Sequence, residues 1–272
     1  MNSLMMTKLL FRARFTVDAY LPPFLGNSLR GALGRALVRG NCAYNEPVCE
    51  VCPEHCVYGE VFKSRAQVKS LDSVPNPFVI DVPYPAREQH KAGENLNFSI
   101  TLFGTAIRHR EEISAAAGEM FRGRLKCLRL DEAKEEYGRE WSDSGSLPFS
   151  ESLKVELLTP LVLLTGKTPV TEIGFDLFAD SLFNRAAGII DVYGGSEFVL
   201  PYALTHRKPK IICENNLRVV KIKQENQPIV GLMGTLRFFG DVTRYLPYVG
   251  LCSEIHFGKM TTRGCGKFRY GI

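Results

Sequence analysis

The sequence has no long apolar run along its 272 residues. No stretch approaches the roughly 18 uninterrupted apolar residues that a membrane-spanning helix needs, so we expect no span. Arg12 and Arg14 interrupt the N-terminal segment where the apolar region of a signal peptide would lie. We therefore expect a cytoplasmic protein. In that compartment its eight cysteines favour a metal site, redox chemistry or plain thiols over a disulfide framework.

The sequence also lacks a strong charge of either sign. Its formal net charge is +5, so it is only mildly basic. This excess is weak evidence for a polyanionic partner, and the distribution of the charges matters more. Hydrophobic residues make up 45% and charged residues 23%, as in ordinary soluble globular proteins. The length suits two domains of about 130 residues each.

The first half follows the order strand, helix, strand, strand, helix, strand. Phe11, Ala13, Phe15 and Val17 alternate with polar residues and predict a strand. Leucines recurring every fourth position over 25–37 predict an amphipathic helix. The remaining elements are expected in NPFVIDVPYP and ENLNFSITLFG as strands, over about 105–121 as a helix, and in GRLKCLRLD as a basic strand.

The second half repeats this order after a serine- and glycine-rich segment, 138–152, which is the best linker candidate. Strands are expected in LKVELLTPLVLLT, FVLPYAL, LRVVKIK and GLMGTLRFFG, and helices in FDLFADSLFNRAAGIIDVYGG and in DVTRYLPYVGLC. Each half approximates β-α-β-β-α-β, the ferredoxin-like order that RNA-recognition modules also use. We predict an α+β protein of two tandem ferredoxin-like domains with antiparallel sheets. They cover residues 1–138, with a cysteine-rich insertion at 42–56, and residues 152–272.

A glycine-rich loop, HFGKMTTRGCGKF at 256–268, precedes the last residues. Gly258, Gly264 and Gly266 free the backbone to turn its amides outward, and such amides form anion-binding nests. The lysines, arginine and threonines of the loop add charge and hydroxyls that suit a phosphate backbone. The loop does not match the nucleotide P-loop, which needs Gly-x-x-x-x-Gly-Lys-Ser/Thr at the start of a helix. The alternative is a glycine-rich hairpin without a ligand.

This loop resembles the C-terminal glycine loop of the RAMP proteins of CRISPR systems. That pattern is Gly-apolar-Gly, five residues including a base, then Gly-apolar-Gly. Here Gly258 is the second glycine, 259–263 are the five residues, GCG closes the pattern, and His256 replaces the opening glycine. LRGALGRAL, FSITLFGTAI and LTPLVLLTGK also resemble segments of one RAMP family, the CRISPR precursor-RNA-processing endoribonucleases, or sixth Cas family. The likeness spans nearly the whole chain, which is similar to the bacterial members that carry a cysteine cluster after the first helix.

The resemblance implies two ferredoxin-like domains and a role in antiviral defence. It implies metal-independent endonuclease cleavage inside CRISPR repeat RNA, with attack by the 2′-hydroxyl leaving a 2′,3′-cyclic phosphate and a 5′-hydroxyl. No catalytic cofactor is expected. One alternative is a RAMP subunit that binds guide RNA in a CRISPR effector complex without cutting it. Another is a zinc-dependent protein-binding module unrelated to CRISPR.

The resemblance places the active site between the first helix with its following loop and the glycine loop. His55 follows that helix and His256 adjoins the glycine loop, and histidine suits acid–base work because its unperturbed pKa lies near ~6.5. Tyr44 and Arg30 are further candidates, for proton transfer and for charge stabilisation. Any one histidine could instead be a surface or hydrogen-bonded residue. His109, which lies between two arginines, is expected on a solvated helix face.

Cys42, Cys49, Cys52 and Cys56 have the spacing C-x6-C-x2-C-x3-C. Because Cys-x2-Cys grips a tetrahedral metal from a tight turn, we expect a structural zinc site. An iron–sulfur cluster and a set of free thiols are the alternatives, and His55 could replace Cys56 as a ligand. Four ligands would close the site to hydrolytic chemistry. The other cysteines are interpreted as packing residues.

Two basic strips suggest an RNA track, one in FRGRLKCLR and one from THRKPK into LRVVKIK. Phosphate contacts would stabilise the RNA there and salt would weaken them, although a solvated strand face explains any single residue. The residues expected to contact RNA are Gly258, Lys259, Thr261, Thr262, Arg263, Gly264, Gly266 and Lys267 of the loop, with Arg207, Lys208 and Lys210. Strand aromatics for base stacking are not evident. The sequence leaves the oligomeric state open.

Overall fold

The computed structural model describes residues 2–42, 49, 56–63, 74–144, 149–195, 197–199, 210–222 and 228–272. The chain divides into two compact units. One, here called the N-terminal unit, comprises Leu4–Glu140 and Val192–Gly195. The other, the C-terminal unit, comprises Met1–Ser3, Trp141–Asp191 and Ser196–Ile272. Within the described residues, none of the helices is both long enough and apolar enough to span a bilayer.

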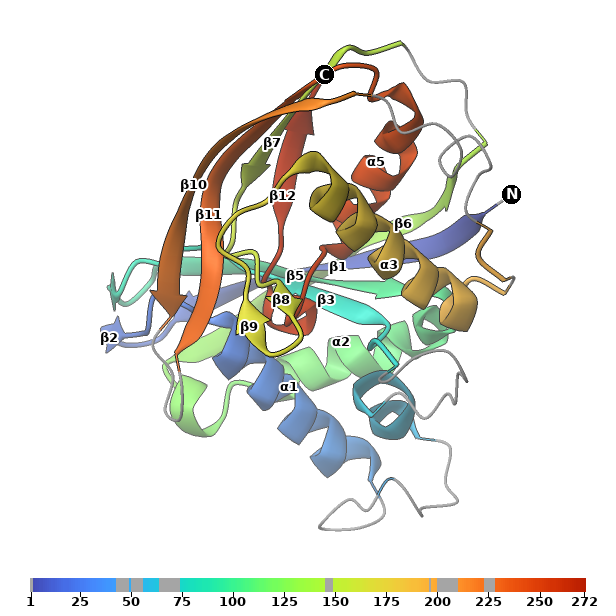
Figure 1. The fold of residues 1–272 in the computed structure, drawn as a ribbon. Helices are drawn as coiled ribbons and strands as arrows, with labels where there is room; N and C mark the ends of the chain where they lie inside the picture. The colour runs from blue at the N-terminus through green and yellow to red at the C-terminus, as the bar shows by residue number, and fades with distance from the viewer. Residues whose placement is uncertain are drawn as a thin grey trace. The chain divides into compact units, whose positions relative to one another are not determined.

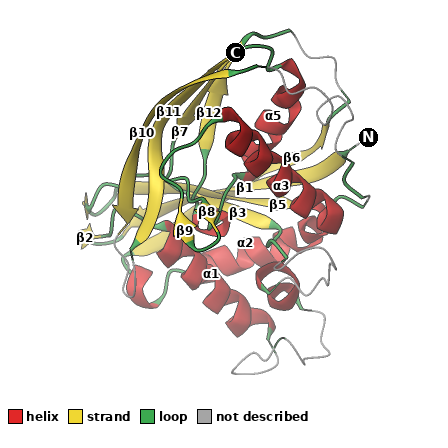
Figure 2. Cartoon of the chain, in the orientation of Figure 1, coloured by secondary structure: helices red, strands yellow, loops and turns green. Residues whose placement is uncertain are grey.

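The N-terminal unit is built on a four-stranded sheet in the order β3-β5-β1-β6, with α1 and α2 on one of its faces (Figures 1 and 2). Its main elements are β1 (Ser3–Phe15), α1 (Gly26–Asn41), β3 (Phe78–Asp81), β5 (Asn95–Phe103), α2 (Arg110–Glu119) and β6 (Leu128–Ser142). Shorter ones are β2 (Ala19–Tyr20), the π-helical turn η1 (Tyr58–Phe62), β4 (Gln89–His90), and the 3₁₀ turns η2 (Gly104–His109) and η3 (Gly123–Leu125).

The predicted periodicities produce the core of this unit. β1 and β5 pair antiparallel and set Phe11 opposite Phe98, with ring centroids 4.9 Å apart. The leucine stripe of α1, including Leu29, Leu33 and Leu37, is buried in the same hydrophobic cluster. Burial of such side chains supplies the main favourable free energy of folding.

The C-terminal unit has the equivalent sheet order, β10-β11-β7-β12. Its main elements are β7 (Ser152–Leu157), α3 (Phe175–Tyr193), β10 (Ile212–Ile222), β11 (Ile229–Phe239), α5 (Leu246–Ile255) and β12 (Phe268–Gly271). Shorter ones are β8 (Leu164–Thr165), β9 (Thr168–Pro169) and the 3₁₀ turns η4 (Thr243–Tyr245) and η5 (Thr261–Arg263). In both units the first main strand lies between the third and the fourth, and the second lies at the outer edge beside the third. This is the ferredoxin-like arrangement, so the predicted fold class is confirmed.

Several element boundaries differ from the prediction. β1 ends at Phe15 because the chain turns there, and Val17 is 55% exposed instead of continuing the apolar face. β6 continues to Ser142, so the predicted linker segment begins as strand. The strand expected in LRVVKIK begins earlier, at Ile212. Residues 198 and 199 of FVLPYAL are not in a strand, and the rest of that segment, 200–204, lies outside the described residues.

Candidate functional site

The glycine loop follows α5 and is fixed by close contacts with the segment after β7. Gly258 has φ +82°, and a Cβ there would lie 2.6 Å from the Val162 carbonyl oxygen. At Gly266, with φ +74°, a Cβ would lie 1.8 Å from the Phe257 carbonyl oxygen. Only glycine fits such contacts at positive φ. These two glycines therefore let the loop pack against its own backbone and its neighbours.

Most amides of the loop donate inward, contrary to the expectation that they would turn outward. The Lys259 amide donates to the Val162 carbonyl (2.8 Å), and the Gly266 amide to the Pro160 carbonyl (3.0 Å). The Lys267 amide donates to the Thr159 hydroxyl (2.9 Å). The amides of Phe257, Arg263, Gly264 and Cys265 also donate to carbonyl groups. An anion at this loop would therefore be held mainly by side chains.

The side chains of the loop differ in exposure. Lys259 is exposed, whereas Thr262, Arg263 and Lys267 are half-buried and Thr261 is buried. Cys265 is fully buried, and burial raises the pKa of its thiol to about 12. Its predicted packing role agrees with that burial. The cations that can reach a phosphate at the loop surface are thus few, with Lys259 the most accessible.

His256 is buried, with only 2% of its surface exposed. It terminates α5 with φ +55° and ψ 165°, in the left-handed region that favours glycine. Arg185 of α3 donates from Nε to the His256 carbonyl (3.2 Å) and from Nη2 to the Ile255 carbonyl (3.0 Å). These bonds satisfy carbonyls at the helix end. The backbone at His256 is therefore held firmly, with its ring directed into the protein.

In the N-terminal unit, Arg30 lies half-buried on α1. Its guanidinium carbon is 5.2 Å from the centroid of the Phe62 ring, a cation–π contact. Phe62 also approaches α1 closely at Gly34, where a Cβ would lie 3.0 Å from the ring. The small residue at this position of the helix therefore accommodates the η1 turn.

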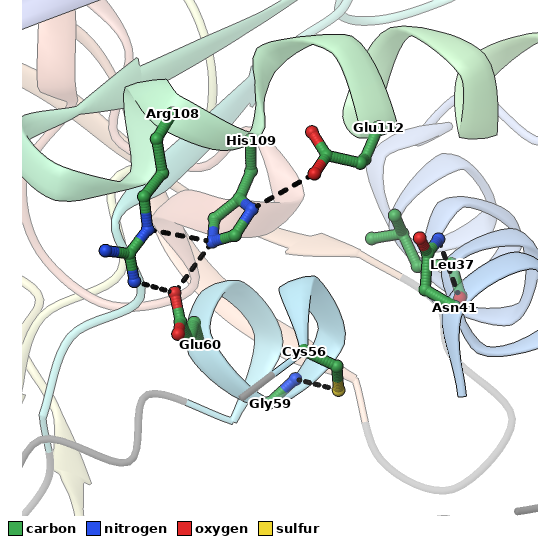
Figure 3. Close-up of polar contacts among 8 residues, drawn as sticks. All are labelled: Leu37, Asn41, Cys56, Gly59, Glu60, Arg108, His109 and Glu112. Atoms are coloured by element: carbon green, nitrogen blue, oxygen red, sulfur yellow. Dashed lines mark hydrogen bonds and ion pairs between the residues drawn. The ribbon is translucent and has the colours of Figure 1, made fainter. Parts of the chain in front are cut away.

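A cluster of charged groups joins η1 to η2 and α2 (Figure 3). His109 Nε2 is 2.7 Å from Glu60 Oε2, His109 Nδ1 is 3.6 Å from Glu112 Oε1, and Arg108 pairs with the same Glu60 carboxylate. The His109 side chain is only 13% exposed, so the expectation of a solvated face was wrong. Burial would raise the pKa of Glu60, but hydrogen bonds from Arg108 and His109 outweigh it and lower that pKa below 4.5.

Three of the four clustered cysteines are described. Cys42 terminates α1, Cys49 is buried, and the Cys56 sulfur accepts a hydrogen bond from the Gly59 amide at 3.4 Å (Figure 3). Cys52 lies outside the described residues. Among the described ones, no three His, Cys, Asp or Glu side chains are grouped to hold a metal ion. The predicted metal site thus stays a prediction, although an amide donor on Cys56 suits a thiolate ligand.

Other predicted site residues also lie outside the described residues: His55, Tyr44, Arg207 and Lys208. Lys210 is described and exposed. Arg30 belongs to the N-terminal unit, whereas His256 and the glycine loop belong to the C-terminal unit. The assignment of catalytic and RNA-binding residues stays a prediction.

The basic strand faces of the N-terminal unit are partly neutralised. Arg12 lies 2.5 Å from Glu132, and Arg14 lies 2.6 Å from Asp131, both carboxylates being on the adjacent β6. Arg129 is 3.4 Å from Asp131 as well. Exposed pairs of this kind contribute little to stability, but they reduce the net positive potential that an RNA backbone would meet.

Sequence reasoning missed Arg185 and Glu60. Arg185 interrupts the apolar stripe of α3, and this interruption is the only signal that could have drawn attention to it. Glu60 meets His109 across 49 positions of sequence, a separation at which residue periodicity carries no information.

Comparison with known families gives a match in each half. Residues 155–268 match the family model of CRISPR-associated endoribonuclease Cas6. Residues 4–133 match a family model described as an N-terminal domain. An uncharacterized protein of Archaeoglobus fulgidus is 32% identical over 113 residues, which are 41% of this chain. The match spans only 38% of that relative's length.

Solved Cas6 structures share the fold along nearly the whole chain. Thermus thermophilus Cas6 aligns with a TM-score of 0.58 and 14% identity, covering 98% of this chain and 99% of that one. A Cas6 in a product complex aligns with a TM-score of 0.61 and 17% identity, covering 98% and 100%. A chain of a partial Cas6-RT-Cas1–Cas2 complex aligns with a TM-score of 0.62 and 11% identity, covering 98% and 46%. The Cas6 family model thus matches residues 155–268, and the chain shares its fold with solved Cas6 structures along nearly its whole length.

Proposed function

We propose that the chain is an endoribonuclease that cuts CRISPR repeat RNA into mature guide RNA. The observation that carries this proposal is the Cas6 match over residues 155–268, which contains the entire glycine loop. A fold shared with a Cas6 in a product complex and with a RAMP protein described as binding different RNA substrates supports RNA as the partner.

The reaction we propose requires no metal ion. The 2′-oxygen attacks the adjacent phosphorus and loses its proton to a general base, the bond from phosphorus to the 5′-oxygen breaks, and a general acid protonates that leaving oxygen. The products are a 2′,3′-cyclic phosphate and a 5′-hydroxyl. His55 and His256 are the proposed base and acid, with Tyr44 as a further proton donor. Arg30 would stabilise the phosphorane charge.

RNA binding would use the side chains of the glycine loop together with Arg207, Lys208 and Lys210. Because most loop amides already have protein acceptors, Lys259, Arg263 and Lys267 would carry most of the phosphate contacts at the loop. Binding of this kind weakens as salt rises, since phosphate contacts release counterions.

Incubation of the purified chain with end-labelled repeat RNA in EDTA tests the activity. We expect one cut per repeat and a product that retains a cyclic phosphate. Loss of activity in EDTA would contradict the metal-independent reaction. The His55→Ala, Tyr44→Ala and Arg30→Ala variants should cleave at least ~100-fold more slowly, the lower range of general acid–base contributions. Full activity in all of them, and in a His256 variant, would overturn the assignment of residues.

A RAMP subunit that binds guide RNA without cutting it is the second candidate. The burial of His256 and the inward hydrogen bonds of the loop favour it, because a buried ring cannot reach a phosphate without local opening. Tight, salt-sensitive binding of repeat RNA without any cyclic-phosphate product would support this function. CRISPR effector subunits would then be its partners.

We also propose that Cys42, Cys49, Cys52 and Cys56 hold a structural zinc ion, which would fix the segment after α1. An iron–sulfur cluster is the alternative. Metal analysis of protein purified without chelator should find roughly one zinc ion per chain, as a four-thiolate site requires. Cys49→Ser should remove it, whereas Cys213→Ser, outside the cluster, should not. Visible absorbance with bound iron would favour the cluster, and metal-free wild-type protein would contradict both.

A further inference from the structure

A short ribbon in the N-terminal unit borders an open pocket of about 440 Å³. The ribbon consists of β2 and β4, which pair antiparallel. The pocket is lined by Tyr20, Arg87, Glu88, Gln89, Lys91 and Glu94. None of these residues belongs to the predicted cleavage site, the glycine loop or the cysteine cluster.

The two faces of the ribbon differ in character. Ala19 pairs with His90, whose ring stacks on the buried Phe15 with centroids 4.2 Å apart and planes 12° apart. Tyr20 pairs with Gln89 on the opposite face, where Tyr20 is 67% exposed and Gln89 is also exposed. Directly paired side chains on one face lie about 5 Å apart at Cβ. The ribbon therefore presents an aromatic ring and a carboxamide side by side to solvent.

The backbone that carries these two side chains is fixed on both sides of the ribbon. The Leu21 amide donates to the Glu88 carbonyl (2.8 Å), and the Ala86 amide donates to the Pro23 carbonyl (2.9 Å). Toward the sheet, the Phe15 amide donates to the Glu94 carbonyl (2.9 Å). Because these bonds already fix the backbone of the ribbon, it loses little conformational freedom when a ligand binds.

The charges of the pocket cancel, and this selects the class of ligand. Arg87 pairs with Glu94, and Lys91 Nζ lies 2.8 Å from Asp18. Glu94 also accepts the Lys91 amide at 3.0 Å. The two cations and the carboxylates of Glu88 and Glu94 give the lining no net formal charge. A phosphate needs excess positive charge, whereas a neutral planar group with polar edges suits this lining.

A nucleobase is such a group. Stacking on an aromatic ring contributes about 1–3 kcal/mol per base in single-strand binding. A glutamine amide can pair in a bidentate manner with an adenine edge. The carboxylates of Glu88 and Glu94 can accept hydrogen bonds from the exocyclic amine of a base. The ring, the amide and the balanced charge thus all favour a base over the RNA backbone.

We propose that this pocket binds one unpaired adenine of the RNA, stacked on Tyr20 and hydrogen-bonded at its edge by Gln89. The proposal rests on the function proposed above, because it takes RNA as the ligand. It gives the protein a contact with single-stranded RNA outside the glycine loop, where base identity and not phosphate charge is recognised.

Fluorescence anisotropy of a labelled oligoadenylate with the full chain tests this proposal. Tyr20→Ala should weaken binding about ten-fold, within the range of one lost base stack. Tyr20→Phe keeps the aromatic ring and should bind with the affinity of wild type. Gln89→Ala should reduce the preference for oligoadenylate over oligouridylate. Phe149→Ala is the control, because it removes another aromatic residue, 69% exposed, from the C-terminal unit. It should change neither the affinity for oligoadenylate nor the preference for it over oligouridylate. The slope of log affinity against log salt should be equal for wild type and Tyr20→Ala, because no phosphate contact is removed.

Photo-crosslinking to oligoadenylate should place the base on Tyr20 or its ribbon. Unchanged affinity of Tyr20→Ala, equal loss in Tyr20→Phe, or crosslinks confined to other segments would each overturn the proposal. Cleavage of repeat RNA by wild type tests the proposed function separately. If wild type cleaves and Tyr20→Ala binds oligoadenylate equally well, only the pocket fails. If wild type does not cleave but binding depends on Tyr20, the pocket stands and the cleavage proposal fails.

Discussion

At the residue scale, His256 differs from the RAMP loop pattern that it resembles, and the difference has a physical cost. The RAMP loop opens with glycine, and here the corresponding residue has φ +55°. Glycine adopts this conformation without strain, whereas a residue with a Cβ loses about 1–3 kcal/mol there. The side chain and the Arg185 bonds to the backbone must therefore offset that cost.

Two substitutions of His256 distinguish the effect of its backbone conformation from the effect of its ring. His256→Gly relieves the strain that His256→Ala retains, so the glycine variant should be more stable than the alanine variant by about 1 kcal/mol in urea unfolding. Both variants lack the ring, so both should lose cleavage equally if the imidazole transfers a proton. Cleavage retained by the glycine variant and lost by the alanine variant would mean that only the backbone matters. Equal stabilities would contradict the strain.

At the element scale, the η1 turn is attached to the rest of the N-terminal unit by two kinds of contact. Phe62 packs into α1 at Gly34 and stacks below Arg30. Glu60 accepts hydrogen bonds from Arg108 and His109 of η2. The turn follows the cysteine-rich segment directly, so its attachment fixes one end of that segment against α1 and η2.

The Glu60 contacts should make stability depend on pH. Since the folded-state pKa of Glu60 is lowered, its contribution is fully present above about 4.5 and is lost as pH falls through the lowered pKa. We expect Glu60→Gln to destabilise the protein by about 1 kcal/mol at pH 7, allowing for partial solvent screening. The difference from wild type should shrink toward pH 3 in chemical unfolding.

Glu112→Gln is the matched control for Glu60→Gln. Its carboxylate faces the same histidine at the longer distance of 3.6 Å and is 43% exposed. The same chemical change there should have a much smaller effect. Equal effects at the two positions, or a Glu60→Gln effect that does not vary with pH, would contradict the role assigned to Glu60.

At the scale of the whole molecule, the sequence predicted the fold better than the site. Alternation in β1 and β5 and the leucine stripe of α1 follow directly from which faces are buried, so two ferredoxin-like units could be read from residue patterns. The burial of His256 could not be predicted from such patterns. It depends on Phe257, which packs between Phe178 and Phe268 with centroid distances of 5.6 and 5.2 Å, and on Arg185, which is distant in sequence. The polarity of the loop suggested exposure instead.

The buried Asn2 bears on how the chain matures during synthesis. Its side chain bonds Asp143 and the Val199 carbonyl, and Tyr248 donates to the same Asp143 carboxylate at 2.9 Å. Asn2 also lies 3.3 Å from the Tyr248 hydroxyl, which the ribosome adds 246 residues later. The network therefore joins positions from residue 2 to residue 248, so this part of the C-terminal unit can form only after both ends of that span have been synthesised.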